Sequence, residues 1–136
     1  MLVSGCATLQ TQNIQPGGLR AYKRVYVEPP PDDEFQVTSA LIVELSNMGF
    51  EISGMPIVSP TDNDLLVTLK PVGGWDMTRY LQSLQIRFIA AKSGRLVSSS
   101  SFYSKGLWRG VKDERLKAIF NDIRKKNGYP LSKQFP

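Results

Sequence analysis

The sequence predicts one α+β domain, a mostly antiparallel sheet of about five strands with two helices packed on one face. The expected order is strand, helix, strand, strand, strand, strand, helix, and a run of strands after one β-α-β unit is typical of this class. Segments 34–48 and 111–126 each carry the apolar stripe of an amphipathic helix, which needs a sheet to cover. With 136 residues, 41% of them hydrophobic, the chain has room for one core.

The β-α-β unit opens with a strand at 22–27, where polar and apolar side chains alternate. Prolines end this strand, and Asp32 and Asp33 follow as acceptors suited to a helix start. Gly49 fits the left-handed position after the helix, and residues 50–53 return as a strand. The stripe of this first helix consists of Val37, Leu41, Leu45 and Met48.

Three more strands are expected at 65–70, 80–91 and 96–103. Pro71 to Asp76 is expected to break the first of them, with a bend or bulge at its two glycines. Gly94 can take the positive φ of a hairpin turn between the other two. Two of the four serines in the last strand must face inward or lie at an edge. The second helix has a stripe made of Leu116, Ile119, Phe120 and Ile123, and its last turn carries Arg124, Lys125 and Lys126.

The only cysteine, Cys6, closes the short run Leu2-Val3-Ser4-Gly5 and is followed by Ala7. This stretch resembles the lipobox of small bacterial outer-membrane lipoproteins of uncharacterised function. The resemblance implies that residues 1–5 are the end of a signal peptide, that Cys6 becomes the acylated (palmitate-bearing) first residue, and that the domain is anchored to the outer membrane facing the periplasm. Only five residues precede Cys6, fewer than a complete secretory signal needs, and the alternative is a free thiol in a disordered tail.

The residues after Cys6 are polar and turn-rich, so 6–19 is predicted to be the lipidated cysteine with a flexible linker. Residues 20–126 are then the periplasmic domain, and 127–136 form a tail. The body from Arg20 to Ile123 is similar to small envelope lipoproteins, through the "D-L-L-V" strand beginning at Asp64 and the "K-S-G-R-L-V" hairpin beginning at Lys92. Related architectures occur in lipoproteins that activate penicillin-binding proteins and in the curli-secretion lipoprotein. The resemblance assigns no catalytic residue.

The composition argues against an enzyme. The chain has no histidine, and its single cysteine lies near one end, so the usual nucleophile-histidine and structural zinc arrangements are excluded. The acid pairs Asp32-Asp33, Asp62 with Asp64, and Asp113-Glu114 stand where helix starts and turns favour acids. No phosphate-binding glycine motif or calcium loop is present. We therefore expect no catalytic residue, no cofactor and no metal.

Aromatic and arginine residues in loops at the ends of the expected sheet are candidates for partner binding, although ordinary packing explains them as well. The partner would be another envelope protein or an anionic glycan. The candidate residues are Trp75, Asp76, Arg79, Tyr80, Trp108 and Arg109.

The first functional hypothesis is a lipid-anchored, non-enzymatic envelope protein that binds or scaffolds another envelope component. The alternative is a small basic domain that binds nucleic acid, because the net charge is +5 and the isoelectric point is near 9.5. In that case an aromatic and basic platform on the first strand would be formed by Tyr22, Lys23, Arg24 and Tyr26.

Overall fold

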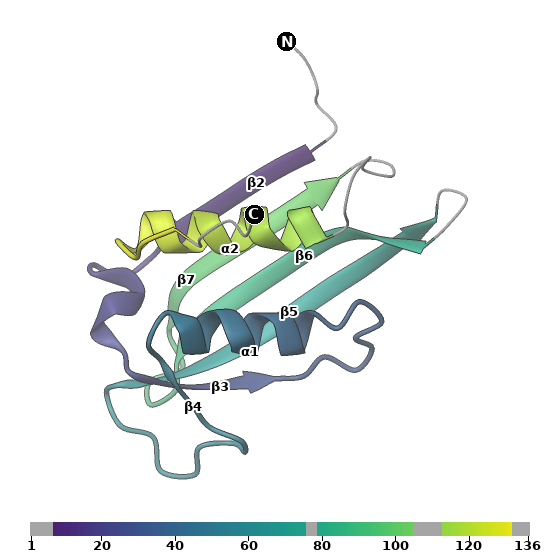
Figure 1. Ribbon diagram of the computed structural model, residues 1–136. Helices are drawn as coiled ribbons and strands as arrows, with labels where there is room; N and C mark the ends of the chain where they lie inside the picture. The colour runs from purple at the N-terminus through teal and green to yellow at the C-terminus, as the bar shows by residue number, and fades with distance from the viewer. Residues whose placement is uncertain (1–6, 76–78, 105–112, 132–136) are drawn as a thin grey trace.

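The computed structural model describes residues 7–75, 79–104 and 113–131. One six-stranded sheet, in the order β2-β7-β6-β5-β3-β4, carries two helices on the same face (Figure 1). The predicted α+β class is confirmed, with six strands in place of about five. The elements are β2 (Ala7–Asn13), the short 3-10 helix η1 (Gly18–Ala21), β3 (Arg24–Glu28), α1 (Val37–Asn47), β4 (Glu51–Ile52), β5 (Asp64–Trp75), β6 (Arg79–Ala90), β7 (Leu96–Ser104) and α2 (Asp113–Lys126).

The β-α-β unit is confirmed, because β3 and β4 pair in parallel and α1 lies between them in the sequence. β3 also pairs in parallel with β5, and the other pairs in the sheet are antiparallel. α1 begins at Val37, three residues later than expected. The reason lies in Asp33, whose carboxylate accepts hydrogen bonds from the backbone N–H groups of Val37 (2.8 Å) and Thr38 (2.9 Å) and so caps the helix there.

β5 does not break at Pro71 but continues to Trp75, which corrects the sequence expectation. Among the described strands, β5 pairs with β3 only as far as Thr68, so Pro71 lies where β5 has a neighbour on one side. Such an edge tolerates a residue without an N–H group. The ladder between β5 and β6 shifts register between Val72 and Gly73, which confirms a bulge at the glycines.

β2 replaces much of the flexible linker that the sequence predicted for 6–19, and that prediction was wrong over residues 7–13. The strand pairs with β7 along its whole length, from Ala7 opposite Ser104 to Asn13 opposite Ser98. Its side chains are mostly polar because it is an edge strand held mainly by backbone hydrogen bonds. One buried bond adds to them, a 2.9 Å hydrogen bond between the hydroxyls of Thr11 and Ser100.

The ends of the predicted domain, 20 and 126, also need correction. Leu19 is fully buried, and its N–H donates to the side-chain oxygen of Asn127 over 2.8 Å. Tyr129 packs on Phe50 with ring centroids 6.1 Å apart, and the guanidinium of Arg20 lies 4.8 Å from the centre of the same ring. The folded unit therefore begins at β2 and includes the start of the expected tail.

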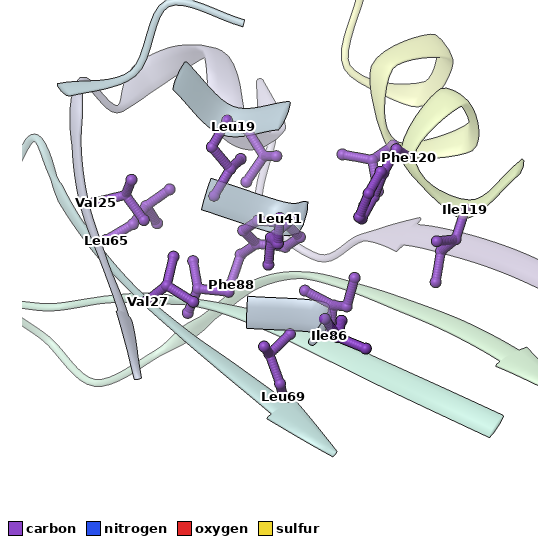
Figure 2. Close-up of a cluster of buried hydrophobic side chains, with 14 of the residues drawn as sticks. Leu19, Val25, Val27, Leu41, Leu65, Leu69, Ile86, Phe88, Ile119 and Phe120 are labelled. Atoms are coloured by element: carbon purple, nitrogen blue, oxygen red, sulfur yellow. The ribbon is translucent and has the colours of Figure 1, made fainter. Parts of the chain in front are cut away.

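The core lies between the sheet and the two helices (Figure 2). Phe88 in β6 is fully buried at its centre, and both predicted helix stripes are buried except for their partly buried outer members Met48 and Leu116. Of the four successive serines in β7, Ser98 and Ser100 face inward, as predicted. No helix in the described ranges is long and apolar enough to cross a membrane.

The two helices are joined by a buried ion pair that the sequence did not reveal. Arg124, which lies in the last turn of α2 as predicted, is only 6% exposed. Its guanidinium pairs with Glu44 on α1 and donates to the carbonyl of Pro130 over 2.9 Å. A charge on a helix end is therefore used here to fix one helix against the other.

Candidate functional site

Three of the six predicted partner-binding residues lie together at the end of the β5–β6 hairpin. Trp75 and Arg79 are opposite each other in the ladder, and Tyr80 is opposite Gly74. Trp75 is 70% exposed, whereas Tyr80 is buried. Asp76, Trp108 and Arg109 lie outside the described residues, as does Cys6. The remaining candidates therefore reduce to one exposed aromatic residue and its neighbours.

Arg79 is engaged within the molecule. Its Nε and one terminal nitrogen donate to the two carboxylate oxygens of Glu34, over 2.8 and 2.7 Å. The hydrogen bonds to this guanidinium lower the pKa of Glu34 from its ordinary value, against the opposing effect of burial. Glu34 precedes α1, so the pair ties the hairpin end to the helix start, and an exposed pair of this kind adds little stability.

The glycines before Trp75 accommodate close side-chain approaches, which the sequence did not indicate. A Cβ on Gly73 would lie 2.2 Å from a guanidinium nitrogen of Arg79, and a Cβ on Gly74 would lie 2.7 Å from the ring of Tyr80. The two glycines thus let Arg79 reach Glu34 and let the Tyr80 ring lie against the backbone.

A second surface, missed by the sequence analysis as a site, is the sheet face that no described helix covers (Figure 1). We call it the helix-free face. Strand alternation and the ladder register place there the residues between the core positions of β2, β7, β6 and β5. Most carry hydroxyl or amide groups. They are Thr8, Gln10, Gln12, Ser99, Ser101, Tyr103, Ser83, Gln85, Arg87, Ile89, Leu66, Thr68, Lys70 and Val72.

Two exposed cations lie near the centre of the helix-free face. Lys70 is opposite Gln85 and Thr68 is opposite Arg87, so Lys70 and Arg87 are diagonal neighbours on adjacent strands, with Cα atoms roughly 7–8 Å apart. Neither forms an ion pair within the described residues. Beside them lies a hollow of about 390 Å³, whose lining includes Lys70, Ser83, Gln85, Ser101 and Tyr103.

Strands β2, β7, β6 and β5 contain one carboxylate, that of Asp64, and it is neutralised. Glu28 of the neighbouring β3 adds an exposed carboxylate to the same face, opposite Thr68. Asp64 is 3% exposed and accepts hydrogen bonds from Nε and a terminal nitrogen of Arg24, over 3.0 and 2.9 Å, and from the N–H of Thr61 over 2.8 Å. The hydrogen bonds from Arg24 are the main cause that lowers the pKa of Asp64 from 3.8 to about 2, with burial opposing them.

The platform expected for nucleic acid is not assembled as predicted. Arg24 is committed to Asp64 in a bidentate pair. Tyr22 packs against the core and its hydroxyl donates to the side-chain oxygen of Gln15 over 2.9 Å. Tyr26 instead lies on the helix-free face and lines a separate, largely apolar hollow of about 330 Å³ next to Pro56 and Ile57. Tyr22, Arg24 and Tyr26 are therefore each held in different contacts and do not form one aromatic and basic platform.

The described residues hold no cluster of three or more His, Cys, Asp or Glu side chains that could bind a metal ion.

No known family model matches the sequence, and no curated protein matches it. Solved structures with the same fold exist. Two structures of the PelC dodecamer from Paraburkholderia phytofirmans match with TM-scores of 0.57 and 0.56 at 14% identity, over 94% of this chain and 99% of that chain. A PDZ domain protein from Parabacteroides distasonis matches with a TM-score of 0.52 at 13% identity, over 93% of this chain and 36% of that one.

Lipoprotein GNA1162 from Neisseria meningitidis matches with a TM-score of 0.48 at 16% identity, over 74% of this chain and 95% of that one. At such identities a likeness shows architecture alone. The chain is thus similar in fold to PelC and to part of a PDZ domain protein.

Proposed function

We propose that this chain is a lipid-anchored, non-enzymatic protein of the bacterial outer membrane, whose domain faces the periplasm and binds another envelope component. The sequence supports the anchor through the lipobox-like run that ends at Cys6. The observation that carries the proposal is the position of β2, which begins at Ala7. An acylated Cys6 is then joined to the sheet without a spacer, and the domain is held close to the bilayer.

The ladder register identifies the residues at the end of the sheet where β2 begins, which is the end that an anchor on Cys6 would bring to the bilayer. Thr8, Tyr103, Ser83 and Val72 lie in one row across four strands, and Ala7 lies one residue beyond that row. β5 continues three residues past Val72, so Trp75 extends past Ala7 by two residues, or roughly 7 Å. Cys6 reaches at most about 3.6 Å past Ala7. We call this end of the sheet, from Ala7 to Trp75 and Arg79, the tether end.

Trp75 is the residue type that prefers the boundary between water and lipid, because its large apolar ring also carries an N–H group. It is 70% exposed; Val72 (41%) and Tyr103 (44%) are also exposed, in a row three positions before Trp75. A bilayer against the tether end would take up this ring at the depth of the headgroups. The lipid on Cys6 and the Trp75 side chain would then be two contacts with one membrane.

The anchor is tested by the intact mass of the protein produced in a Gram-negative host from its full upstream reading frame. We expect a chain that starts at Cys6 and carries a lipid-sized mass increase, and no such increase for Cys6→Ala. An unmodified chain that retains Met1 would contradict the anchor.

The orientation is tested by fluorescence quenching with brominated lipids in vesicles that carry the lipidated protein. Trp108→Phe leaves Trp75 as the single tryptophan. A matched control carries Trp75→Phe and Trp108→Phe with Met55→Trp, because Met55 is 68% exposed in the loop at the opposite end of the sheet. We expect strong quenching of Trp75 and little quenching at position 55. Equal quenching at the two positions would contradict the proposed orientation.

A further inference from the structure

The described residues of the helix-free face carry more positive than negative charge. Exposed strands usually mix both signs of charge, but the described strands β2, β7, β6 and β5 hold one carboxylate, Asp64, which is paired with Arg24 at the end far from Trp75. Lys70 and Arg87 are exposed on the same face and form no ion pair within the described residues. Glu28 of β3 is also exposed on this face, opposite Thr68 and diagonal to Lys70, so the two cations outnumber the described unpaired carboxylate near them and the centre keeps a net positive charge.

The groups around the two cations are hydroxyls and amides. Ser83 and Gln85 of β6 and Ser101 of β7 lie in adjacent positions of the ladder, and Tyr103 is 44% exposed next to Ser83. These side chains donate and accept hydrogen bonds without charge. Together with the hollow of about 390 Å³ that they line, they form a shallow surface rich in polar groups and sparsely charged.

We propose that the helix-free face binds an anionic polysaccharide, with Lys70 and Arg87 on its acidic groups and the Ser83, Gln85 and Ser101 side chains on its hydroxyls. A polyhydroxylated chain with spaced negative charges matches this surface in both respects. This inference deepens the proposed function. It rests on that proposal only for the compartment in which the chain meets the polymer.

Two other occupants fit the face less well. Protein interfaces are depleted in serine and enriched in aromatic residues, methionine and arginine, whereas this face is built mainly from serine, threonine and glutamine. Single-stranded nucleic acid carries a phosphate on every nucleotide and is bound by stacking aromatic rings in a strongly basic groove. Lys70 and Arg87 are the only cations of these four strands on the face, and Tyr103 is the only exposed ring there among the described residues.

The binding experiment uses the full chain with Cys6→Ser, so that the polymer is tested in solution and independently of lipid. The probes are oligogalacturonate, alginate and dextran sulfate, with neutral dextran and a single-stranded DNA oligonucleotide for comparison, all titrated calorimetrically at physiological ionic strength. The test variant is Lys70→Gln with Arg87→Gln. The matched control is Lys117→Gln with Lys125→Gln, which removes the same net charge from exposed positions on α2.

We expect at least one of the acidic polysaccharides to bind, neutral dextran not to bind, and the test variant to lose at least tenfold in affinity, or about 1.4 kcal/mol. The control should bind like the parent chain. Ser101→Phe, which fills the hollow without changing charge at an exposed position, should weaken binding to a similar extent.

Three results would overturn the inference. These are no binding of any acidic polysaccharide, an equal loss in the test and control variants, or tighter binding of the DNA oligonucleotide than of every polysaccharide. Because Cys6→Ser carries no lipid, failure here would leave the membrane anchor standing, and failure of the mass experiment would leave the polysaccharide result standing.

Discussion

Asp64→Asn should destabilise the fold in a way that depends on pH. The carboxylate is 3% exposed and receives hydrogen bonds from Arg24 and from the N–H of Thr61. These interactions lower the pKa of Asp64 from 3.8 to about 2. The ionised form of this side chain is therefore bound more strongly in the folded protein than in the unfolded chain.

The sign and the size of the effect follow from this shift. Because the folded pKa of Asp64 lies below the unfolded one, the stabilisation is fully present above about pH 4 and is lost as the pH falls through 3.8 towards about 2. Each tenfold change in proton affinity corresponds to about 1.4 kcal/mol, which gives an upper bound of about 2.5 kcal/mol at neutral pH. The Arg24 side chain is 37% exposed, so solvent screens the pair, and we expect about 1–2 kcal/mol.

The assay is urea unfolding followed by far-UV circular dichroism, at neutral pH and near the folded pKa of Asp64. The difference in unfolding free energy between the parent chain and Asp64→Asn should shrink by more than half between the two conditions. Asp62→Asn is the matched control, since the Asp62 side chain is 87% exposed and lies 3.5 Å from Lys92 Nζ, and it should change the stability by less than about 0.5 kcal/mol. A parent-to-variant difference that is the same at both pH values would refute the reasoning.

Two further predictions concern packing. Phe88→Ala empties the centre of the core, where the side chain is fully buried, and should cost about 3–5 kcal/mol in urea unfolding. The control Val43→Ala changes a position on α1 that is 59% exposed, and its stability should stay within about 0.5 kcal/mol of the parent. Similar losses for the two variants would contradict the assigned core. Gly74→Ala places a Cβ 2.7 Å from the Tyr80 ring and should cost about 1–3 kcal/mol. Gly54→Ala, with no atom within 4 Å of its Cβ, is the control, and a harmless Gly74→Ala would show that the ring can move away.

The sequence predicted those elements whose apolar residues are periodic. The helices and the core face of β6 were found in this way, and the turn at Gly94, which has a φ of 77°, was found from its glycine. The sequence analysis did not predict β2, because an edge strand needs backbone partners more than apolar side chains. Its partner β7 is also some ninety residues away in the chain. Pro71 suggested a break because nothing local indicates that β5 is an edge at that point.

The candidate sites were less predictable for a related reason. Trp75, Arg79 and Tyr80 were correctly placed near one another, because a hairpin brings close neighbours in sequence together. Arg79 is held in an ion pair, whereas Trp75 is exposed. This difference depends on Glu34, which lies 45 residues away from Arg79 in the chain. In the sequence, the helix-free face showed only as polar residues alternating along each single strand. Its shared positive centre needed the register that sets Lys70 beside Arg87.

The pairing of β2 with β7 also has a mechanical consequence. A load applied to the chain before Ala7 would act along the axis of β2, whose whole length is hydrogen-bonded to β7. Pulling along the strand axis strains all of these bonds at once, whereas pulling at right angles would open them one after another. Thr11 and Ser100, joined by a buried hydrogen bond, lie partway along this seam. With the proposed anchor on Cys6, β2 would therefore serve as a shear-resistant attachment, and tension from the membrane would be spread across the edge of the sheet.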